Sequence, residues 1–564
     1  MARVYIQMIL AINILLITMT LADTTALEYN RLPAVVIVVL ARDASDFLPT
    51  SLACLANLNY DKKRIAFWIA TDNNQDQTEE MLVEWKSQVE SDYHRVEIMT
   101  SNNYSLQTDL SLQWTPSRYR HLLQLRQLAL AAALKYWADY VLFVDADNFL
   151  TEPDTLIELI KSNRTMVAPM LIESRHSYYS NFWCGVDEQG YYRRTEDYLP
   201  TLKRERKGVL QVAMIHSTFL IDLNRKSVEK FSFYPPHSSY QGHIDDLLIF
   251  SYSTKMAGIP FHLLNNKIYG YLFSSPQVQE LITRRESFLN YKLNQLLDGV
   301  QFPRWNLISD PCRQWGKLPF DQVYVINLLR RKERRQYMKA LLDEICLDAE
   351  FFEAIDGRQL NEEKIAKLGI QILPGYLDPF HQRPMKYGEI GCFLSHYQLW
   401  KKVIQFNYSS ILILEDDVKV KMGFHRQLSQ VMQEAQSLSL PWDIIYIGRK
   451  KLLSEAEISV KGANYLIWPD YSYWTVGYIL SASGAKKLLA SQPLTHMMAI
   501  DEFLPIMYNK HPRKDWKEIF PERNLIAISA EPLLIEPAFY VADKDYVSDT
   551  EDSSIVVADQ HDEL

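Results

Sequence analysis

Short apolar runs alternate with amphipathic stretches along the first half of the chain. Residues 33–41 (PAVVIVVLA) and 65–71 (IAFWIAT) are brief and rich in β-branched residues, which predicts buried parallel strands. Helical spacing of the apolar positions fills the intervals 46–57, 78–88 and 122–137. This order predicts an α/β fold with a parallel sheet, whose ligands lie beyond the carboxyl ends of the strands.

A second α/β pattern begins at residue 322. The run 322–328 (QVYVINL) is followed by a charged segment and a predicted helix, and further strands are expected at 410–414 and 443–448. Between the two halves, residues 276–316 are helical in pattern and then loop-like around Pro303 and Pro311. We therefore expect two tandem α/β domains of similar plan, without obvious sequence repetition. Their predicted ranges are 30–275 and 319–540, with a linker over 276–318.

The two ends of the chain carry targeting patterns. After Arg3, an apolar run extends over 4–21 and ends near small residues, which predicts a signal peptide over 1–22; the run is marginal as a bilayer span. The final residues His561 to Leu564 read HDEL, a retrieval signal for the endoplasmic reticulum. The two signals require each other. Together they predict a protein of the endoplasmic reticulum lumen that does not span the membrane and is bound by the HDEL/KDEL receptor.

The net charge of −9 is concentrated near the C-terminus. From Asp543 onward there are eight acids and one lysine, so the rest of the chain is nearly neutral and is not expected to bind nucleic acid. The acidic segment 541–564 is predicted to be a disordered tether that presents HDEL.

Cysteines and sequons add two smaller expectations. The five cysteines include no CxxC pair, which argues against a zinc site, and their odd number leaves at least one thiol outside an intramolecular disulfide bond. In a lumenal protein the sequons at Asn103, Asn163 and Asn407 become glycosylation candidates, and they predict surface positions.

The sharpest chemical feature of the first half is the sequence YVLFVDADN over 140–148. An apolar strand ends there in Asp145 and Asp147, whose i and i+2 spacing places them on one face of an extended chain. Two hard oxygen ligands suit Mg²⁺ or Mn²⁺ and leave coordination positions for diphosphate oxygens. A solvated turn is the alternative. The position at a strand end, after a predicted helix, favours metal and nucleotide binding.

The second half contains a parallel feature. The run ILILEDD over 411–417 ends in Glu415, Asp416 and Asp417, of which Glu415 and Asp417 share a face. All three are candidate metal ligands. A charged strand terminus without a metal is the alternative interpretation.

Transfer of a group from a nucleotide to a hydroxyl acceptor also needs a base for that hydroxyl. In the first half Asp245 and Asp246 precede a helical run and are candidates, and His262 could complete a metal shell. In the second half Asp501 and Glu502 hold the equivalent place. For each acid, a carboxylate stabilised by a helix N-terminus is an equally good interpretation, and an isolated histidine is more often structural.

The charged run after the strand at 322–328 suits an anion. Arg330, Arg331 and Arg334 lie where a helix begins, and helix N-termini and arginines both favour phosphate. A solvated helix face explains some of the same charges. In the segment GEIGCFLSH over 388–396, we expect the glycines to permit a close approach of the backbone and the segment to lead into a helix.

Several of these segments together resemble glycosyltransferase family 25, the family of bacterial lipooligosaccharide galactosyltransferases. The resemblance is carried by VYVINLLRRKERR (323–335), GEIGCFLSH (388–396), ILEDD (413–417), GYILSASGAKKLL (477–489) and DEFLP (501–505). With FVDADN, HIDDLLIF and YVSDTE, nearly all of the mature chain is similar to the animal endoplasmic-reticulum members. The resemblance implies a nucleotide-sugar site that includes Asn327, Arg330, Arg331, Arg334, Glu389 and His396.

The resemblance also implies a fold and an activity. It implies two tandem GT-A-like domains and an inverting transferase that moves galactose from UDP-galactose to hydroxylysine of collagen, with Mn²⁺. The motifs concentrate in the second domain, which we expect to carry galactose transfer. Three alternatives stay open: both domains catalyse, adding galactose and then glucose; one domain only binds acceptor; or the chain is a catalytically silent binding, adhesion or chaperone-like member. A homodimer is compatible with the sequence.

Overall fold

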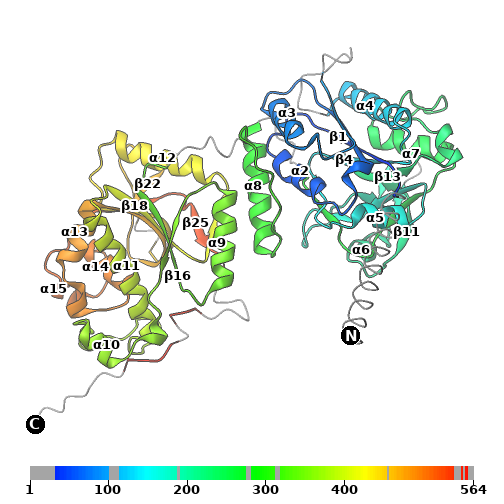
Figure 1. The fold of residues 1–564 in the computed structure, drawn as a ribbon. Helices are drawn as coiled ribbons and strands as arrows, with labels where there is room; N and C mark the ends of the chain where they lie inside the picture. The colour runs from blue at the N-terminus through cyan, green and yellow to red at the C-terminus, as the bar shows by residue number, and fades with distance from the viewer. Residues whose placement is uncertain are drawn as a thin grey trace, which may run out of the picture. The chain divides into compact units, whose positions relative to one another are not determined.

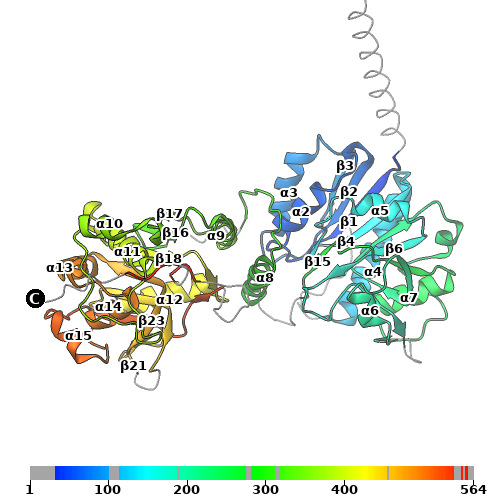
Figure 2. The same ribbon diagram turned by 90° about the horizontal axis from the view of Figure 1, so that it is seen from below.

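The computed structural model describes residues 32–100, 114–186, 191–274, 281–310, 318–453, 457–538, 548–550 and 553–556. Contacts divide the chain into two compact units (Figures 1 and 2). The first comprises the residues up to Phe288 together with Phe302–Gln314, and the second comprises Leu289–Gln301 and the residues from Trp315. Within the described residues, no helix is both long enough and apolar enough to cross a membrane. The predicted signal peptide and the HDEL segment lie outside the described residues.

The first unit is built around a mixed sheet. Its described part has eight strands in the order β11-β14-β6-β13-β4-β1-β2-β3. The elements of this unit are β1 Val35–Leu40, α2 Leu48–Ala56, β2 Ile65–Ala70, α3 Thr78–Val89, β3 Arg95–Met99, α4 Pro116–Lys135, β4 Tyr140–Asp145, β5 Asn148–Phe149, α5 Thr155–Lys161, β6 Met166–Pro169, β7 Leu171–Ile172, β8 Phe182–Trp183, β9 Gly185–Val186, β10 Tyr192–Arg193, α6 Tyr198–Leu202, β11 Val209–Val212, β12 Met214–Ile215, β13 Thr218–Asp222, α7 Asp246–Met256, β14 Phe261–Leu264 and β15 Gly270–Leu272.

Parallel pairing brings the ends of three strands to one edge of this sheet. Leu40 of β1 pairs with Ala70 of β2 and with Asp145 of β4, so these strands end at the same level. On its other side β4 pairs antiparallel with β13. The predicted strands and helices of this half are therefore confirmed. The carboxyl edge carries Asp145, as the sequence pattern requires.

The second unit repeats this plan. Its sheet has the order β17-β16-β18-β23-β20-β24-β22-β21 in the described residues. Its elements are β16 Gln322–Asn327, α9 Lys332–Glu344, β17 Glu350–Glu353, α10 Glu362–Lys367, α11 Tyr387–Gln405, β18 Ser410–Glu415, β19 Val418–Val420, α12 Phe424–Ser437, β20 Ile444–Lys451, β21 Ile458–Ser459, β22 Leu466–Trp468, β23 Ser472–Ser481, α13 Ala482–Ala490, α14 Ile500–Met507, α15 Lys514–Ile519, β24 Ala527–Ala530 and β25 Ile535–Pro537. The helix α8, Leu281–Leu297, lies in the predicted linker, and its residues are divided between the two units.

The strands that end in carboxylates have equivalent neighbours in the two sheets. In the second unit β18 pairs parallel with β16 and antiparallel with β23, as β4 does with β1 and β13. In both units the short strand after the carboxylates, β5 or β19, leaves the main sheet and pairs antiparallel with a later strand. The expectation of two domains similar in plan is thus confirmed at the level of strand order and direction.

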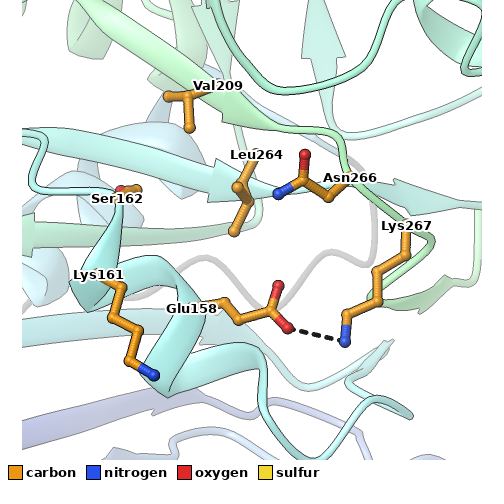
Figure 3. Close-up of a pocket in the computed structure, with 7 residues that line it drawn as sticks. All are labelled: Glu158, Lys161, Ser162, Val209, Leu264, Asn266 and Lys267. Atoms are coloured by element: carbon orange, nitrogen blue, oxygen red, sulfur yellow. Dashed lines mark ion pairs between the residues drawn. The ribbon is translucent and has the colours of Figure 1, made fainter.

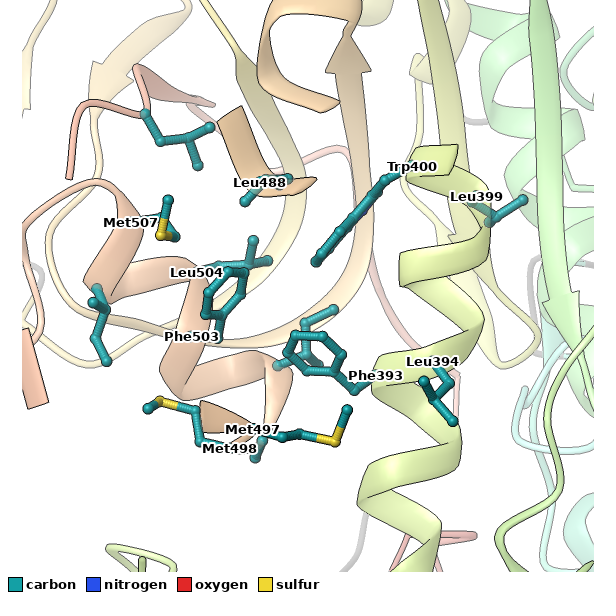
Figure 4. Close-up of a cluster of buried hydrophobic side chains, with 14 of the residues drawn as sticks. Phe393, Leu394, Leu399, Trp400, Leu488, Met497, Met498, Phe503, Leu504 and Met507 are labelled. Atoms are coloured by element: carbon teal, nitrogen blue, oxygen red, sulfur yellow. The ribbon is translucent and has the colours of Figure 1, made fainter. Parts of the chain in front are cut away.

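Two hydrophobic clusters cover the faces of the second sheet. One is formed largely by α11 and α14, with Phe393, Trp400 and Phe503 fully buried (Figure 4). The other includes Leu341 of α9 and Leu428 of α12. Figure 1 shows the sheet between these two groups of helices. Packing on both faces of the sheet holds its strands in place, so the acids at the end of β18 have defined positions.

Candidate active site

Asp145 and Asp147 lie at the carboxyl edge of the first sheet, where β4 ends. Burial raises the pKa of Asp145; the nearby Arg126 opposes this rise and Asp246 adds to it. Burial also raises the pKa of Asp147, and the charge of Asp145 adds to the effect. Two partly buried carboxylates, of which Asp145 destabilises the charge of Asp147, suit a divalent cation with hard oxygen ligands.

Arg126 is a member of this site that the sequence patterns did not single out. It lies on α4, is 4% exposed, and donates from Nη1 to Asp246 Oδ2 at 2.7 Å. Its Nη2 lies 3.8 Å from Asp145 Oδ1. Arg126 thus links the predicted metal carboxylate to one of the two predicted bases. The available signal was that Arg126 is one of two cations, with Lys135, among many apolar residues of the predicted helix 122–137.

The neighbouring carboxylates Asp245 and Asp246 have different roles. Asp245 is the N-cap of α7 and accepts a hydrogen bond from the Leu248 backbone N–H at 2.9 Å, which matches the alternative interpretation as a helix-terminal acid. Asp246 is bound to Arg126 and faces the β4 terminus. Burial lowers the pKa of His216 to about 4, and the charge of Asp246 opposes this shift. The sequence analysis did not single out His216. Asp246 is therefore the candidate that belongs to this site.

His262 does not reach the carboxylates of β4. It pairs with Val167 of β6, and the register through β13 puts it level with Leu142, three residues before Asp145. Three strand spacings of about 4.8 Å also separate β14 from β4. The predicted role of His262 as a metal ligand beside Asp145 is therefore wrong. Strand order was not readable from the sequence.

The carboxylates at the end of β18 fall into two groups. Asp416 accepts from the side-chain amide of Asn327 at 2.7 Å and lies 3.0 Å from Arg334. Glu415 accepts instead from the Thr475 hydroxyl of β23 at 2.5 Å. Asp417 lies 3.4 Å from Arg334. Asp416 is held by β16 and α9, whereas Glu415 is held by β23.

Negative charge is concentrated at the end of β18, which raises the pKa values of Glu415 and Asp416. Burial raises the pKa of Glu415, and the charges of Asp417 and Asp501 raise it further. Burial raises the pKa of Asp416 to about 6 although Arg334 opposes the shift. A divalent cation fits this surplus of negative charge, and Glu415 and Asp417, whose charges act on each other, are candidate oxygen donors for it.

Asp501 and Glu502 lie in the first turn of α14, but only one is available for chemistry. Glu502 is fully buried, and its Oε2 accepts from the Tyr471 hydroxyl and His511 Nε2, both at 2.7 Å. Asp501 is less deeply buried, and its Oδ1, like Glu502 Oε1, has no hydrogen-bond partner among the described residues. Burial raises the pKa of Asp501 to about 7, and the charge of Glu502 adds to this rise. A carboxylate poised near neutral pH is suited to general base catalysis.

The arginines after β16 converge on a carboxylate from the C-terminal segment. Arg330 and Arg331 each place a guanidinium nitrogen 2.6 Å from Asp549 Oδ1, and Arg334 lies 3.5 Å from Oδ2. Arg330 also donates to Asp356 at 3.0 Å. The described residues 548–550 and 553–556 are therefore packed on the second unit, and the prediction of a disordered tether is wrong for them.

Glu389 and His396, which both lie on α11, make structural contacts with residues outside that helix. Glu389 accepts from the Lys386 backbone N–H at 2.6 Å and lies 3.0 Å from Arg383, which closes the N-terminal turn of the helix. His396 is 1% exposed, and its Nδ1 lies 2.9 Å from the Tyr478 hydroxyl. Burial lowers the pKa of His396 to about 3. A neutral, enclosed histidine does not offer a side chain to a nucleotide sugar in this structure.

The glycines of the GEIG segment permit close backbone approach, as predicted. A Cβ on Gly391 would lie 2.3 Å from the Ile355 carbonyl oxygen, and one on Gly388 would lie 2.8 Å from the Asp549 carbonyl oxygen. Both positions of the helix are therefore packed against other chain segments. This explains the glycines without any direct role in chemistry.

The cysteines and sequons have simple placements. Cys54, Cys184 and Cys392 are free, whereas Cys346 is disulfide-bonded. Asn163 and Asn407 are exposed and adopt positive φ just after α5 and α11. Asn103 lies outside the described residues.

A surface hollow of about 570 Å³ lies elsewhere on the first unit (Figure 3). It is lined by residues from α5, β14 and the following loop, and Lys267 lies 2.8 Å from Glu158 across it. The carboxylates of β4 do not line it. In the described part of the chain, no three His, Cys, Asp or Glu side chains form a ready metal cluster. A metal held by two carboxylates would take its other ligands from a diphosphate and water.

Comparisons with known proteins agree with the two-domain plan. Residues 32–292 match the family model described as glycosyltransferase family 25, N-terminal domain, and residues 320–504 match glycosyltransferase family 25 (LPS biosynthesis protein). The chain belongs to glycosyltransferase family 25. The predicted fold, tandem α/β glycosyltransferase domains, is thereby confirmed.

Relatives within family 25 include proteins with and without a named activity. The chain is 44% identical to procollagen galactosyltransferase 1-B of Xenopus laevis, over 93% of this chain and 86% of that protein. It is 42% identical to inactive glycosyltransferase 25 family member 3 of Homo sapiens, over 94% of this chain and 90% of that protein. A mannosyltransferase from Pyrobaculum calidifontis, solved with GDP-Man and Mn²⁺, is 12% identical. That match covers 50% of this chain and 73% of the other, with a TM-score of 0.28, too low to bear on the site.

Proposed function

We propose that this protein is an inverting galactosyltransferase that moves galactose from UDP-galactose to hydroxylysine of collagen. Relatives named procollagen galactosyltransferase share 43–45% identity over 93% of the chain, which supports the substrate class. The observation that carries a transferase chemistry is the group of buried carboxylates at the end of β18 with Asp501 beside it.

The residues of the second unit can be given roles in this reaction. Glu415 and Asp417 would hold Mn²⁺, which supplies charge neutralisation for the UDP leaving group. Asp501 accepts the proton of the hydroxylysine hydroxyl as that oxygen attacks the anomeric carbon. Attack from the face opposite UDP converts the α-linked donor into a β-linked product. Arg330, Arg331 and Arg334 supply positive charge near the diphosphate.

We assign galactose transfer to the second unit. Its available acid, Asp501, has a pKa raised to about 7, whereas Asp246 of the first unit is bound to Arg126. In this assignment the first unit, with Asp145 and Asp147, binds acceptor or transfers a second sugar such as glucose. Asp147→Ala and Asp417→Ala, assayed separately with UDP-galactose and a hydroxylysine peptide, test the choice. Near-full activity of the Asp417 variant would place galactose transfer elsewhere.

Identity alone does not separate an active chain from a silent one, because the inactive human relative is almost as similar as the named transferases. The carboxylates of both sheets favour activity. Metal-dependent release of UDP from UDP-galactose by the purified chain tests this point directly. Absence of both hydrolysis and transfer would favour a binding or chaperone-like role.

The compartment and the acceptor state belong to the same proposal. The HDEL pattern at 561–564 supports residence in the endoplasmic reticulum lumen through its receptor. Because a triple helix is a stiff, wide rod, a site at a strand edge favours a single, unfolded collagen chain. Equal galactosylation rates for triple-helical and melted collagen would contradict the expected acceptor state.

A further inference from the structure

The carboxylate of Asp549 is the common partner of three arginines. Arg331 binds it through Nε at 2.9 Å and Nη2 at 2.6 Å, and Arg330 adds a contact of 2.6 Å. Arg334 lies 3.5 Å away on the other carboxylate oxygen. Burial raises the pKa of Asp549, but the arginines outweigh burial and the net shift is downward. Asp549 is therefore a charged group enclosed by guanidinium ions.

Arg334 connects this ionic cluster to the metal carboxylates. Its Nη1 lies 3.0 Å from Asp416 Oδ1 and 3.4 Å from Asp417 Oδ2. Nη1 of Arg334 therefore contacts Asp549 and both aspartates that follow β18. Because a guanidinium is planar and rigid, these carboxylates together restrict the direction of its remaining N–H groups.

The segment that carries Asp549 is attached over several residues. The Ser553 hydroxyl accepts from the Gly388 backbone N–H at 2.9 Å, and the Ser554 carbonyl accepts from the Tyr387 backbone N–H at 3.1 Å. Val556 donates from its backbone N–H to the Met385 carbonyl at 2.9 Å and is 4% exposed. These contacts attach the described residues of the segment to residues 385–388 at the start of α11.

We propose that Asp549 is a positioning residue of the second-unit site, which holds Arg330, Arg331 and Arg334 in the orientation that receives the donor diphosphate. The inference rests on the proposed function for the identity of the donor. Four carboxylates, those of Asp549, Asp356, Asp416 and Asp417, contact these three arginines, so the proposed role of Asp549 is to set the direction of the guanidinium N–H groups and not to leave a surplus of positive charge. The opposite idea, that Asp549 occupies the diphosphate position and inhibits the enzyme, predicts effects of the opposite sign.

Steady-state kinetics on the full chain distinguish the positioning role of Asp549 from an inhibitory role. Asp549→Asn keeps the shape of the side chain but removes its charge, and we expect KM for UDP-galactose to rise by about tenfold with kcat changed less. Asp549→Glu should recover part of the loss. The matched control is Asp515→Asn, which removes a carboxylate from Arg513 on the exposed surface of α15 and should leave KM unchanged. An unchanged or lower KM in Asp549→Asn would overturn the proposal.

Hydrogen exchange gives a local readout that does not require turnover. With UDP and Mn²⁺ added to the wild-type chain, peptides that cover 330–337 and 548–556 should exchange more slowly. Faster exchange at 548–556 would show that the nucleotide displaces the segment, which contradicts the proposal. In Gly388→Ala the new Cβ would clash with the Asp549 carbonyl oxygen and should abolish the protection at 330–337. Protection without any sugar transfer would reject the proposed reaction while supporting the role of Asp549.

Discussion

Arg126 Nη1 lies 2.7 Å from Asp246 Oδ2, which joins helix α4 to the start of α7 across 120 residues of sequence. The same guanidinium lies 3.8 Å from Asp145, so one buried cation is shared between a candidate metal ligand and a candidate base. This arrangement holds Asp246 beside the β4 terminus. It also explains how Arg126 can lie on α4 with only 4% of its surface exposed.

Replacing Arg126 with methionine should destabilise the first unit by about 3 kcal/mol, because it leaves Asp246 partly buried without its partner. Arg206→Met is the matched control, since Arg206 pairs with Asp197 at 2.9 Å on the exposed surface and should cost less than about 1 kcal/mol. Thermal unfolding, with hydrogen exchange in α4 and β4, measures both effects. Equal losses for the two variants would mean that the buried pair contributes no more than a surface pair.

The sequence predicted the strands and the carboxylate positions because these depend on short-range patterns. A run of β-branched residues that ends in acids identifies both β4 and β18 within fewer than ten residues. The partners of those acids could not be predicted in the same way. Arg126 and Asp246 are 120 residues apart, and Arg331 and Asp549 are 218 apart, so only the fold brings them together.

The errors of prediction have the same physical origin. His262 was a reasonable metal ligand by residue type, but strand order separates β14 from β4. The acidic composition of the C-terminal segment suggested disorder, yet Asp549 meets three arginines and Val556 enters the core. Composition describes the average of a segment, whereas one ion cluster and one apolar residue suffice to hold it.

The two acids of α14 should respond in opposite ways to loss of charge. Asp501→Asn should lower kcat by about 10²-fold or more, as expected for a general base, with stability unchanged or increased because burial and the charge of Glu502 already oppose the ionised form of Asp501. Glu502→Gln should instead cost about 3 kcal/mol of stability, since Glu502 accepts from Tyr471 and His511 in a fully buried position. Kinetics and unfolding measured on the same two variants separate the roles. A stable, inactive Glu502→Gln would reverse the assignment.

Stability of the second unit should fall as the pH is lowered through the range of His396. The pKa of His396 is about 3 in the fold and 6.5 as its ordinary value, so below pH 6.5 the unfolded chain binds a proton that the fold resists. The contribution is complete above pH 6.5 and decreases toward pH 3, by about 2 kcal/mol between pH 6.5 and 5. His396→Gln should flatten this dependence, whereas substitution of the exposed His381 should not. Unfolding midpoints at pH 7 and pH 5 provide the comparison, and an equal slope for His396→Gln would contradict it.

Two C-terminal deletions should separate retention from catalysis. Removing His561 to Leu564 leaves Asp549 and Val556 in place, so we expect normal transfer activity and more enzyme in the medium of expressing cells. Removing residues 548–564 also takes away the partner of Arg330, Arg331 and Arg334, and activity in the purified protein should fall together with affinity for UDP. Full activity in the longer deletion would show that the arginines need no carboxylate to hold them. Retention of the shorter deletion would show that another contact, such as a partner protein, keeps the enzyme in the cell.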